Sequence, residues 1–453
     1  KYYIKSQQKF NHKMRHKLIL LLVLFSAFAY SQDEKINFTL QEAIDYALEN
    51  NRTSKNAERD IDAAVKQKWE TTATGLPQLN GSIDYQNQIK QQFEAIDFDQ
   101  DGVPDFGAKH SMIASAQLTQ KVFDGSYLVG LQSAKVFLEI SKNAKEKTDL
   151  EVRKSVINAY GNVLIVEENI SILNRNIAVL EKNLDETTKI YENGLEEEES
   201  VEQLKITLSG VKSNLNNTSR LKDIAYKMLN ITLGRDIDSQ AILVDTLESL
   251  TEQNMVLSLL EAEYTVEKTI DYKIAENDKT SKELLLKLEK SKALPTLNAF
   301  LNGSYIANRQ VFDFADFNNR WVGTATFGAN LSIPLFSSGM RSAATQRAKI
   351  NLEKSEADLK ETEQKIKLQI ASAKSDYKFA IEDYENKKEN LSLSERIEQK
   401  NQTKFFEGIA SSFELRQAQT QLYSAQQEYL QSMLDVINKK AELETVLNDI
   451  PKN

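Results

Sequence analysis

The stretch Lys404–Gln419, KFFEGIASSFELRQAQ, separates two long helical patterns. Before it, small and apolar residues recur at steps of four and three, the spacing of a coiled-coil seam: Ile366, Ile370, Ala373, Tyr377, Ala380 and Tyr384. After it, the spacing continues through Leu415, Ala418, Leu422, Ala425, Tyr429, Ser432, Val436, Lys439, Leu443 and Val446, where only Lys439 is charged. Gly408 can adopt the left-handed conformation that ends a helix, and Ser411 or Ser412 can cap the next one. The stretch therefore predicts the tip of a long antiparallel helical hairpin.

The same tip occurs earlier in the chain. Gly194-Leu195 and Val201 recur as Gly408-Ile409 and Leu415, at an offset of 214 positions. The earlier tip also lies between two seams, Ile170, Leu173, Ile177, Leu180, Leu184 and Tyr191 before it, and Val201, Leu204, Leu208, Val211 and Leu215 after it. A repeat spaced by about half the chain indicates duplication of a whole structural unit.

Each repeat also contains two segments in which apolar and polar residues alternate. They are Leu79–Gln86, Ala114–Val122, Leu297–Tyr305 and Trp321–Ile333. Four strands of about ten residues with one apolar and one polar face fit a transmembrane β-barrel. A soluble sheet packed on a core is the alternative that the pattern leaves open. Because four strands cannot close a barrel of useful width, the membrane interpretation requires oligomerisation.

Long helices are predicted over residues 134–193 and 341–404. At about 1.5 Å per residue, each would span roughly 90 Å. A cytosolic coiled coil would explain these seams equally well, but not the strands. Residues 231–262 lack a long seam, which predicts short elements there.

The N-terminal residues have the features of a secretory signal peptide. Met14-Arg15-His16-Lys17 precedes an apolar run, Leu18–Ala29, and Ala29-Tyr30-Ser31 places small residues where a signal peptidase would cleave. The run is too short for a membrane span. We expect residues 1–13 to lie upstream of the true start at Met14.

Composition restricts the remaining classes. The chain has no cysteine, which excludes disulfides and a lipid-anchored N-terminal cysteine. Residues 1–31 hold six Lys or Arg and no acid, although the net charge of the chain is −9, so the acidic excess lies in the remainder. An acidic protein is a poor ligand for nucleic acid.

The tip pattern, an aromatic residue followed by Gly-Leu/Ile and then Val/Leu-x-x-Ala/Leu, resembles that of the TolC family of outer-membrane efflux and secretion channels. The resemblance extends from about residue 38 to the end of the chain. It implies a mixed fold, in which long antiparallel coiled-coil hairpins form an α-barrel and each subunit adds four strands to a twelve-stranded β-barrel in a homotrimer. It also implies the outer membrane of a Gram-negative bacterium, with the tunnel extending into the periplasm.

The predicted organisation follows from the duplication. It comprises an upstream extension and signal peptide (1–31), a first repeat (32–235) with β-hairpin 78–122 and helical hairpin 134–230, a connecting equatorial region (236–262), and a second repeat (263–453) with β-hairpin 296–335 and helical hairpin 341–448.

The resemblance also assigns roles to the two tips. In the family, the second hairpin narrows the periplasmic aperture, where acidic residues from three subunits meet. By position, Glu414 matches a family acid, Gln417 stands where a second acid is often found, and Ala410 replaces a gating arginine of some members; Gly408 forms the turn. The first tip has Gly194 and an acidic run, Glu196, Glu197, Glu198 and Glu199, for which docking of an adaptor protein, ion selection and an ordinary solvated turn all remain open.

One loop resembles the start of a calcium-binding loop. Asp97, Asp99, Asp101 and Asp105 supply carboxylates at alternating positions that could converge on a hard cation. Ala108 occupies the place of the expected position-twelve acid, so the match is partial. A structural Ca²⁺ in this loop, which the topology places outside the cell, and an acidic solvated turn are the two interpretations.

Candidate catalytic groups are sparse. Only His110 of the three histidines lies beyond the signal region, and no nucleophile–base pair, phosphate loop or zinc spacing can be assembled. We therefore predict a non-enzymatic, trimeric outer-membrane channel in contact with outer-membrane lipid. It would passively conduct substrates delivered by an inner-membrane transporter and a periplasmic adaptor. The alternatives are a coiled-coil scaffold or adhesin stalk without a pore, and a soluble intracellular coiled coil.

Overall fold

The computed structural model describes residues 36–91, 94–98, 100, 107–261, 263–315 and 321–448. The predicted signal peptide lies outside these residues. The chain divides into two compact units. Within the described residues, the tip unit comprises 36–52, 152–260 and 376–442, and the sheet unit comprises 53–151, 261–375 and 443–448, with the gaps given above. Each unit takes segments from both predicted repeats.

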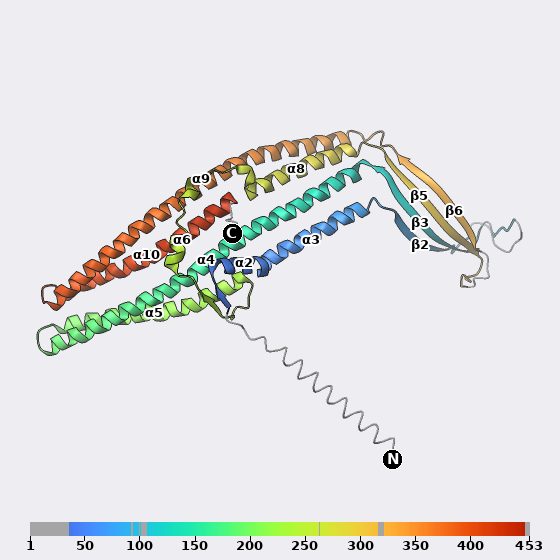
Figure 1. Ribbon diagram of the computed structural model, residues 1–453. Coiled ribbons are helices and arrows are strands. Elements are labelled where there is room, and N and C mark those ends of the chain that lie inside the picture. The colour runs from blue at the N-terminus through green and yellow to red at the C-terminus, as the bar shows by residue number, and fades with distance from the viewer. Residues whose placement is uncertain are drawn as a thin grey trace, which may run out of the picture. The chain divides into compact units, whose positions relative to one another are not determined.

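The first helical hairpin consists of α4 (Gly125–Glu192) and α5 (Glu198–Leu233) (Figure 1). In the tip unit, the predicted seam is buried where Ile177 and Leu180 meet Leu204 and Leu208. Two ion pairs, Lys212–Glu181 at 2.6 Å and Lys222–Glu167 at 2.8 Å, connect the same helices. Tyr191, predicted as the next seam residue, is more than a third exposed because α4 ends directly after it.

The second helical hairpin consists of α9 (Met340–Phe406) and α10 (Ser412–Leu447). All six predicted seam residues of α9 are buried. Lys439, the charged residue of the α10 seam, forms ion pairs with Asp376 at 3.1 Å and Glu442 at 3.2 Å. These hydrogen-bonded carboxylates raise its pKa and keep it charged. A second face of α10 is also buried, and the seam pattern did not predict it: Leu430, Met433, Leu434, Ile437 and Ala441.

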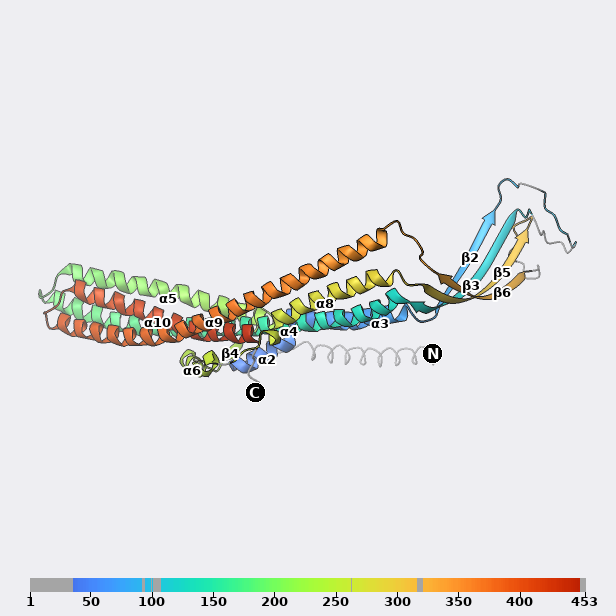
Figure 2. The same ribbon diagram turned by 90° about the horizontal axis from the view of Figure 1, so that it is seen from above.

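The second buried face of α10 packs on α4. A Cβ added to Gly161 would lie 2.5 Å from Cδ1 of Leu434, so the two helices approach closely there. Asn176 Nδ2 donates to Gln426 Oε1 at 2.8 Å, and Lys154 lies 3.7 Å from Glu442. The helices of the tip unit therefore form one layer in which α4 and α10 are neighbours and α4 also reaches α9, and both ribbon views show the four helices running side by side (Figure 2).

A belt of short elements covers the end of this layer that lies away from the tips. β1 (Ile36–Phe38) pairs in parallel with β4 (Ala241–Leu243), and α2 (Leu40–Asn50) starts with a capping box formed by Thr39 and Glu42. Buried Tyr160 of α4 donates its hydroxyl to Phe38 O at 2.8 Å and to Asp245 Oδ2 at 2.9 Å.

The other belt helices are α6 (Leu247–Gln253) and α7 (Ser258–Glu261). Tyr377 of α9 donates its hydroxyl to Asn254 O at 2.5 Å and accepts from Val256 N at 2.9 Å. One buried tyrosine from each long helix thus holds the belt.

In the sheet unit, three helical elements lie alongside the first part of α4: α3 (Arg52–Ala73), η1 (Val266–Lys268) and α8 (Ile270–Ser291). Tyr127 Oη donates to Thr72 O at 3.0 Å, and Lys147 pairs with Asp271 at 2.9 Å. α4 begins nine residues earlier than predicted, because Asp124 accepts hydrogen bonds from the backbone N–H groups of Ser126 and Tyr127 and caps the helix.

The sheet unit contains four antiparallel strands in the order β2–β3–β5–β6. Their bounds are β2 Gln78–Asn87, β3 His110–Asp124, β5 Thr296–Arg309 and β6 Val322–Ser332. Each predicted repeat contributes one pair of strands. The two pairs are joined by antiparallel pairing of β3 with β5, which places Leu118 opposite Leu301 and Ser115 opposite Ser304. The predicted alternation holds across the sheet, since Leu118 and Ser115 lie on opposite faces.

Candidate functional site

Within the part of the chain that the structure describes, nothing covers the apolar face of the sheet. Leu79, Ile83, Tyr305 and Phe327 are 72%, 74%, 61% and 78% exposed. A soluble sheet would bury such a face against helices or a second sheet. No described element packs on this face as a soluble sheet would require, so the face needs an apolar medium or a partner.

The opposite face of the same strands bears hydroxyl groups. Ser82, Ser115, Ser304 and Thr324 lie in register across all four strands. Their hydroxyls form hydrogen bonds at 2.9 Å between Ser82 and Ser115 and at 2.8 Å between Ser304 and Thr324. Residues of this polar face, among them Asn80 and Ser82, are also exposed. The sheet thus presents two faces of opposite polarity.

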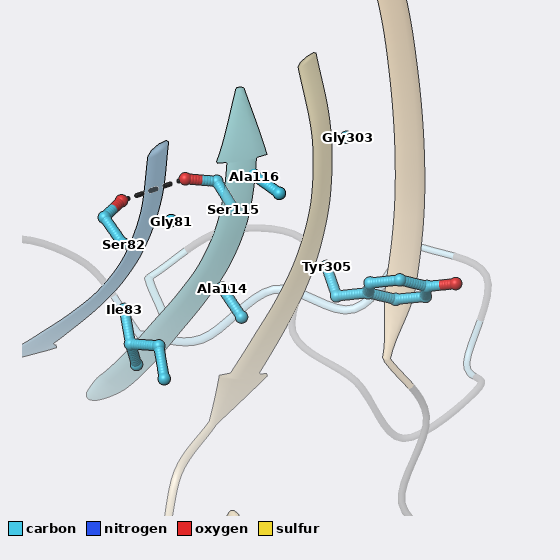
Figure 3. A pocket seen from close by; sticks show the side chains of 8 residues that line it. All are labelled: Gly81, Ser82, Ile83, Ala114, Ser115, Ala116, Gly303 and Tyr305. Atoms are coloured by element: carbon cyan, nitrogen blue, oxygen red, sulfur yellow. Dashed lines mark hydrogen bonds between the residues drawn. The ribbon is translucent and has the colours of Figure 1, made fainter. Parts of the chain in front are cut away.

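A shallow hollow of about 720 Å³ crosses the middle of the sheet (Figure 3). Its floor lacks bulk because Gly81, Ala116 and Gly303 lie in register on neighbouring strands. Ile83 and Tyr305 also line it. The hollow follows from this row of small residues.

Aromatic residues gather where β2 and β3 join the loop after β5. The Tyr85 ring lies 5.4 Å from the Phe312 ring and 5.9 Å from the Phe314 ring, measured between centroids. Tyr85 Oη and His110 Nδ1 are 2.8 Å apart. Aromatic residues at the end of an apolar band form the interfacial girdle of transmembrane barrels.

The second tip has the predicted backbone geometry. Gly408 has φ 73°, Gly408 N donates to Phe405 O at 3.0 Å, and Ile409 N donates to Lys404 O at 2.8 Å. These two bonds define a Schellman motif, in which a left-handed glycine satisfies the last carbonyls of a helix. The structure thus confirms Gly408 as the helix stop.

Ser411 and Glu414 form a capping box at the start of α10. The Glu414 carboxylate accepts from Ser411 N at 2.8 Å and from Ser411 Oγ at 3.1 Å, while Glu414 N donates to Ser411 Oγ at 3.3 Å. The hydrogen bonds from Ser411 lower the pKa of Glu414, so it stays ionised at neutral pH. Glu414 and Gln417 are both exposed. The capping role of Glu414 was not predicted from the sequence, although Ser-x-x-Glu is a capping-box signature.

The first tip repeats the backbone but not the cap. Gly194 has φ 75°, and Leu195 N donates to Ile190 O at 3.1 Å. Glu197 is the N-cap of α5 and makes no side-chain cap bond. Glu196 instead accepts from Ser200 Oγ at 2.6 Å, and Glu199 accepts from Gln203 Nε2 at 2.8 Å. Glu197, Glu198 and Glu199 are exposed, so the acidic run faces solvent within the chain.

A layer of buried polar side chains lies a few turns from the tips, where the hairpins meet. Asn183, Thr187 and Gln419 are almost completely buried, and Gln402 Nε2 donates to Asn183 Oδ1 at 2.8 Å. Burial raises the pKa of the neighbouring Glu398, although the Gln419 side chain beside it partly offsets that rise. The seam pattern missed this layer because it scores only apolar and small residues.

The candidate calcium loop falls largely outside the described residues. Of its four predicted ligands only Asp97 is described; Asp99, Asp101 and Asp105 are not. No helix within the described residues has a stretch long and apolar enough to cross a bilayer.

The site therefore defines a class of protein: one that presents an uncovered, two-faced antiparallel sheet together with paired helical hairpins. The sequence profile of the outer membrane efflux protein family matches residues 43–235 and 284–449, which is well over half of the chain. The chain belongs to this family, whose members are channels and not enzymes. No curated protein sequence matches the chain significantly.

Solved structures show the same fold. CusC, whose structures concern conformational changes that accompany folding and transmembrane channel formation, matches with a TM-score of 0.74 at 17% identity, over 90% of this chain and 91% of that chain. The outer membrane protein VceC from Vibrio cholerae matches with a TM-score of 0.71 at 16% identity, over 90% and 95%. The outer membrane channel CmeC from Campylobacter jejuni matches with a TM-score of 0.70 at 17% identity, over 90% and 85%. The predicted fold class and family are confirmed.

Proposed function

We propose that the protein is a homotrimeric outer-membrane channel that passively conducts substrates from the periplasm to the cell exterior. The observation that supports this most is the sheet with an uncovered apolar face and a hydroxyl-bearing opposite face, the arrangement of a barrel wall between lipid and an aqueous lumen. β2 and β6 are the sheet edges and have unpaired backbone groups on their outer sides. Pairing β6 of one copy with β2 of the next would satisfy both edges and yield twelve strands from three copies.

The proposal includes a periplasmic adaptor and an inner-membrane transporter as partners, as expected for the family. The exposed tips are the docking surface in this proposal. At the first tip, Leu195 is 79% exposed and is directly followed by the acidic run Glu196–Glu199, and Ile409 at the second tip is 71% exposed. An apolar knob beside acidic side chains suits an adaptor surface with an apolar pocket and basic neighbours.

We further propose that the second tip forms the periplasmic aperture, with Glu414 and Gln417 near the three-fold axis and Gly408 in its turn. The lowered pKa of Glu414 supports a permanently charged ring.

For the loop Asp97–Asp105, which the family topology places outside the cell, we propose a structural Ca²⁺. Calorimetric titration with Ca²⁺ of the wild type and of the Asp99→Ala/Asp101→Ala double variant tests this calcium site. Equal heats of binding for the two proteins would contradict it. We also propose that the chain consists of two repeats, 32–235 and 263–453, joined by the connecting region 236–262.

Two measurements test the channel itself. The protein should fractionate with the outer membrane as a trimer that dissociates only on heating, and purified trimers should give discrete conductance steps in planar bilayers. A scaffold or adhesin stalk would give trimers without conductance. A soluble intracellular coiled coil would appear in neither assay.

A further inference from the structure

The parallel strand pair of the belt, β1 and β4, has a free edge. The hydrogen bond from Val244 N to Phe38 O, at 3.0 Å, continues this pairing and shows which backbone groups of β4 face β1. Alternate residues of a parallel strand bond to the same neighbour, so Ile242 bonds to β1, and the N–H and C=O groups of Ala241 and Leu243 point to the other side. In the part of the chain that the structure describes, this sheet has two strands and none lies on that side.

A groove of about 440 Å³ adjoins this edge, and Ala241 is among the residues that line it. One wall is formed by α5 between Lys222 and Asn230, and the other by the segment from Ile237 to Ile242. Ligand sites in proteins have volumes of about 300–1,000 Å³. The free edge therefore borders a space that is large enough for a segment of another chain.

The two lysines of the groove each have an acidic partner. Lys222 lies 2.8 Å from Glu167, and Lys227 lies 3.0 Å from Asp238. The Tyr226 hydroxyl donates to the same Glu167 carboxylate at 2.9 Å. Because both cations are balanced locally, the groove does not select an anionic ligand. The backbone groups of the β4 edge are the recognition elements that remain.

The segment that carries this edge is fixed in place. Asn230 Nδ2 donates to Ser239 O at 2.7 Å and to Ile237 O at 3.2 Å. Gly234, with φ 81°, starts the segment, and a Cβ at this position would clash with the backbone carbonyl of Asn50. The turn is therefore held closely against the end of α2. A preorganised edge loses little conformational freedom when it binds a ligand.

The edge also lacks the features that usually protect a free strand. Proteins block such edges with lysine, proline or a bulge, whereas β4 has the sequence Ala-Ile-Leu. Ile242 and Val244 are two positions apart, so their side chains point to the same face, and they are 46% and 57% exposed. Exposed β-branched side chains at these positions suit contact with alternate side chains of a neighbouring strand.

We propose that the free edge of β4 binds an extended segment of another protein, which adds a third strand to the β1–β4 sheet. An extended backbone matches the alternating N–H and C=O groups of Ala241 and Leu243, and such strand addition takes its affinity from main-chain hydrogen bonds. The partner segment has alternating apolar side chains, which lie against Ile242 and Val244. The belt is then an attachment point separate from the tips. Such binding neither requires nor alters the proposed pore.

A fluorescein-labelled peptide of alternating threonine and valine is the probe for this edge. Fluorescence anisotropy with the full-length, detergent-purified protein gives its Kd. Leu243→Pro should weaken binding about tenfold, because it removes an outward N–H of β4 and none that bonds to β1. Leu243→Ala is the matched control, since it shortens the same side chain but keeps the N–H. It should bind within about twofold of the wild type.

Modified peptides test the same pairing without any change to the protein. N-methylation of all valine amides, or of all threonine amides, blocks the N–H groups along one edge of the peptide. Because only one edge of the peptide pairs with β4, one modified peptide should bind as the parent does. The other should bind about tenfold more weakly or not at all.

The possible outcomes separate this site from the channel. Absence of binding to the wild type, or equal binding to the wild type and to a Leu243→Pro protein that still forms trimers, would overturn the site. Equal losses from both modified peptides would overturn it too, because they would show recognition of side chains. Binding to separated monomers but not to trimers would mean that a neighbouring copy covers β4, which excludes another protein. Conductance of the variants tests the proposed channel separately and should match that of the wild type.

Discussion

The sheet and the tip-unit helices both leave apolar residues uncovered, but in different shapes. On the sheet a whole face is uncovered, from Leu79 on β2 to Phe327 on β6. On the tip-unit helices, exposed apolar side chains instead form narrow rows, such as Ile206, Ile224, Met228 and Ile231 on α5. A broad apolar face suits a fluid apolar solvent, whereas a narrow row of apolar side chains suits contact with another helix. The shape of an uncovered surface therefore indicates what covers it.

The largest effect is expected from a charge on the broad face. Leu301→Arg should impair membrane assembly by about 2–4 kcal/mol, because it places a cation in the middle of the lipid-facing band. Asn302→Arg, one residue along β5 on the polar face, should assemble nearly as well as wild type. The amount of heat-modifiable trimer in outer-membrane fractions measures both. Equal assembly of the two variants would contradict the assignment of the faces.

The polar layer near the tips should respond to pH. Because burial raises the pKa of Glu398 above its ordinary value of 4.5, the packed hairpins bind its proton more tightly than the unfolded chain does. Its contribution to stability is complete below that ordinary value and is lost as pH rises through the raised value. The change is at most about 1 kcal/mol, since the carboxylate is only half-buried.

Glu398→Gln should remove this part of the pH dependence, and the exposed Glu395→Gln on the same helix should not. Thermal melts of each variant across that pH window give the comparison. Superimposable pH profiles for wild type and Glu398→Gln would show that the layer does not titrate there.

The smallest effect concerns the second tip. Glu414→Gln should reduce the cation preference of the pore at low salt, because three ionised carboxylates concentrate cations and salt screens them. A glutamine can still accept the capping bonds from Ser411, so the helix start should lose only a few tenths of a kcal/mol. Glu199→Gln at the first tip is the control. Identical reversal potentials for wild type and Glu414→Gln would place the selective ring elsewhere.

Features that depend only on the residue pattern along a single helix or strand were predicted from the sequence. The two tips, the α9 seam and the strand alternation follow from the order of residues such as Gly408 and Leu301, and the structure confirms them. The sequence did not predict the second face of α10, because burial of Met433 and Leu434 depends on which helix lies beside them. Nor did it predict the layer of Asn183, Thr187 and Gln419, since buried amides at a helix interface look like solvated positions in a sequence.

The central claim is that the sheet separates lipid from an aqueous lumen, and thiol labelling along β5 tests it most directly. Single cysteines at Leu301, Asn302, Ser304 and Tyr305 can be introduced one at a time into the cysteine-free chain. In outer membranes, a small water-soluble reagent should label the variants at Asn302 and Ser304, and a lipid-soluble reagent should label those at Leu301 and Tyr305. Two results in assembled trimers would contradict a lumen behind this sheet. Either the water-soluble reagent labels all four positions, or it labels none of them.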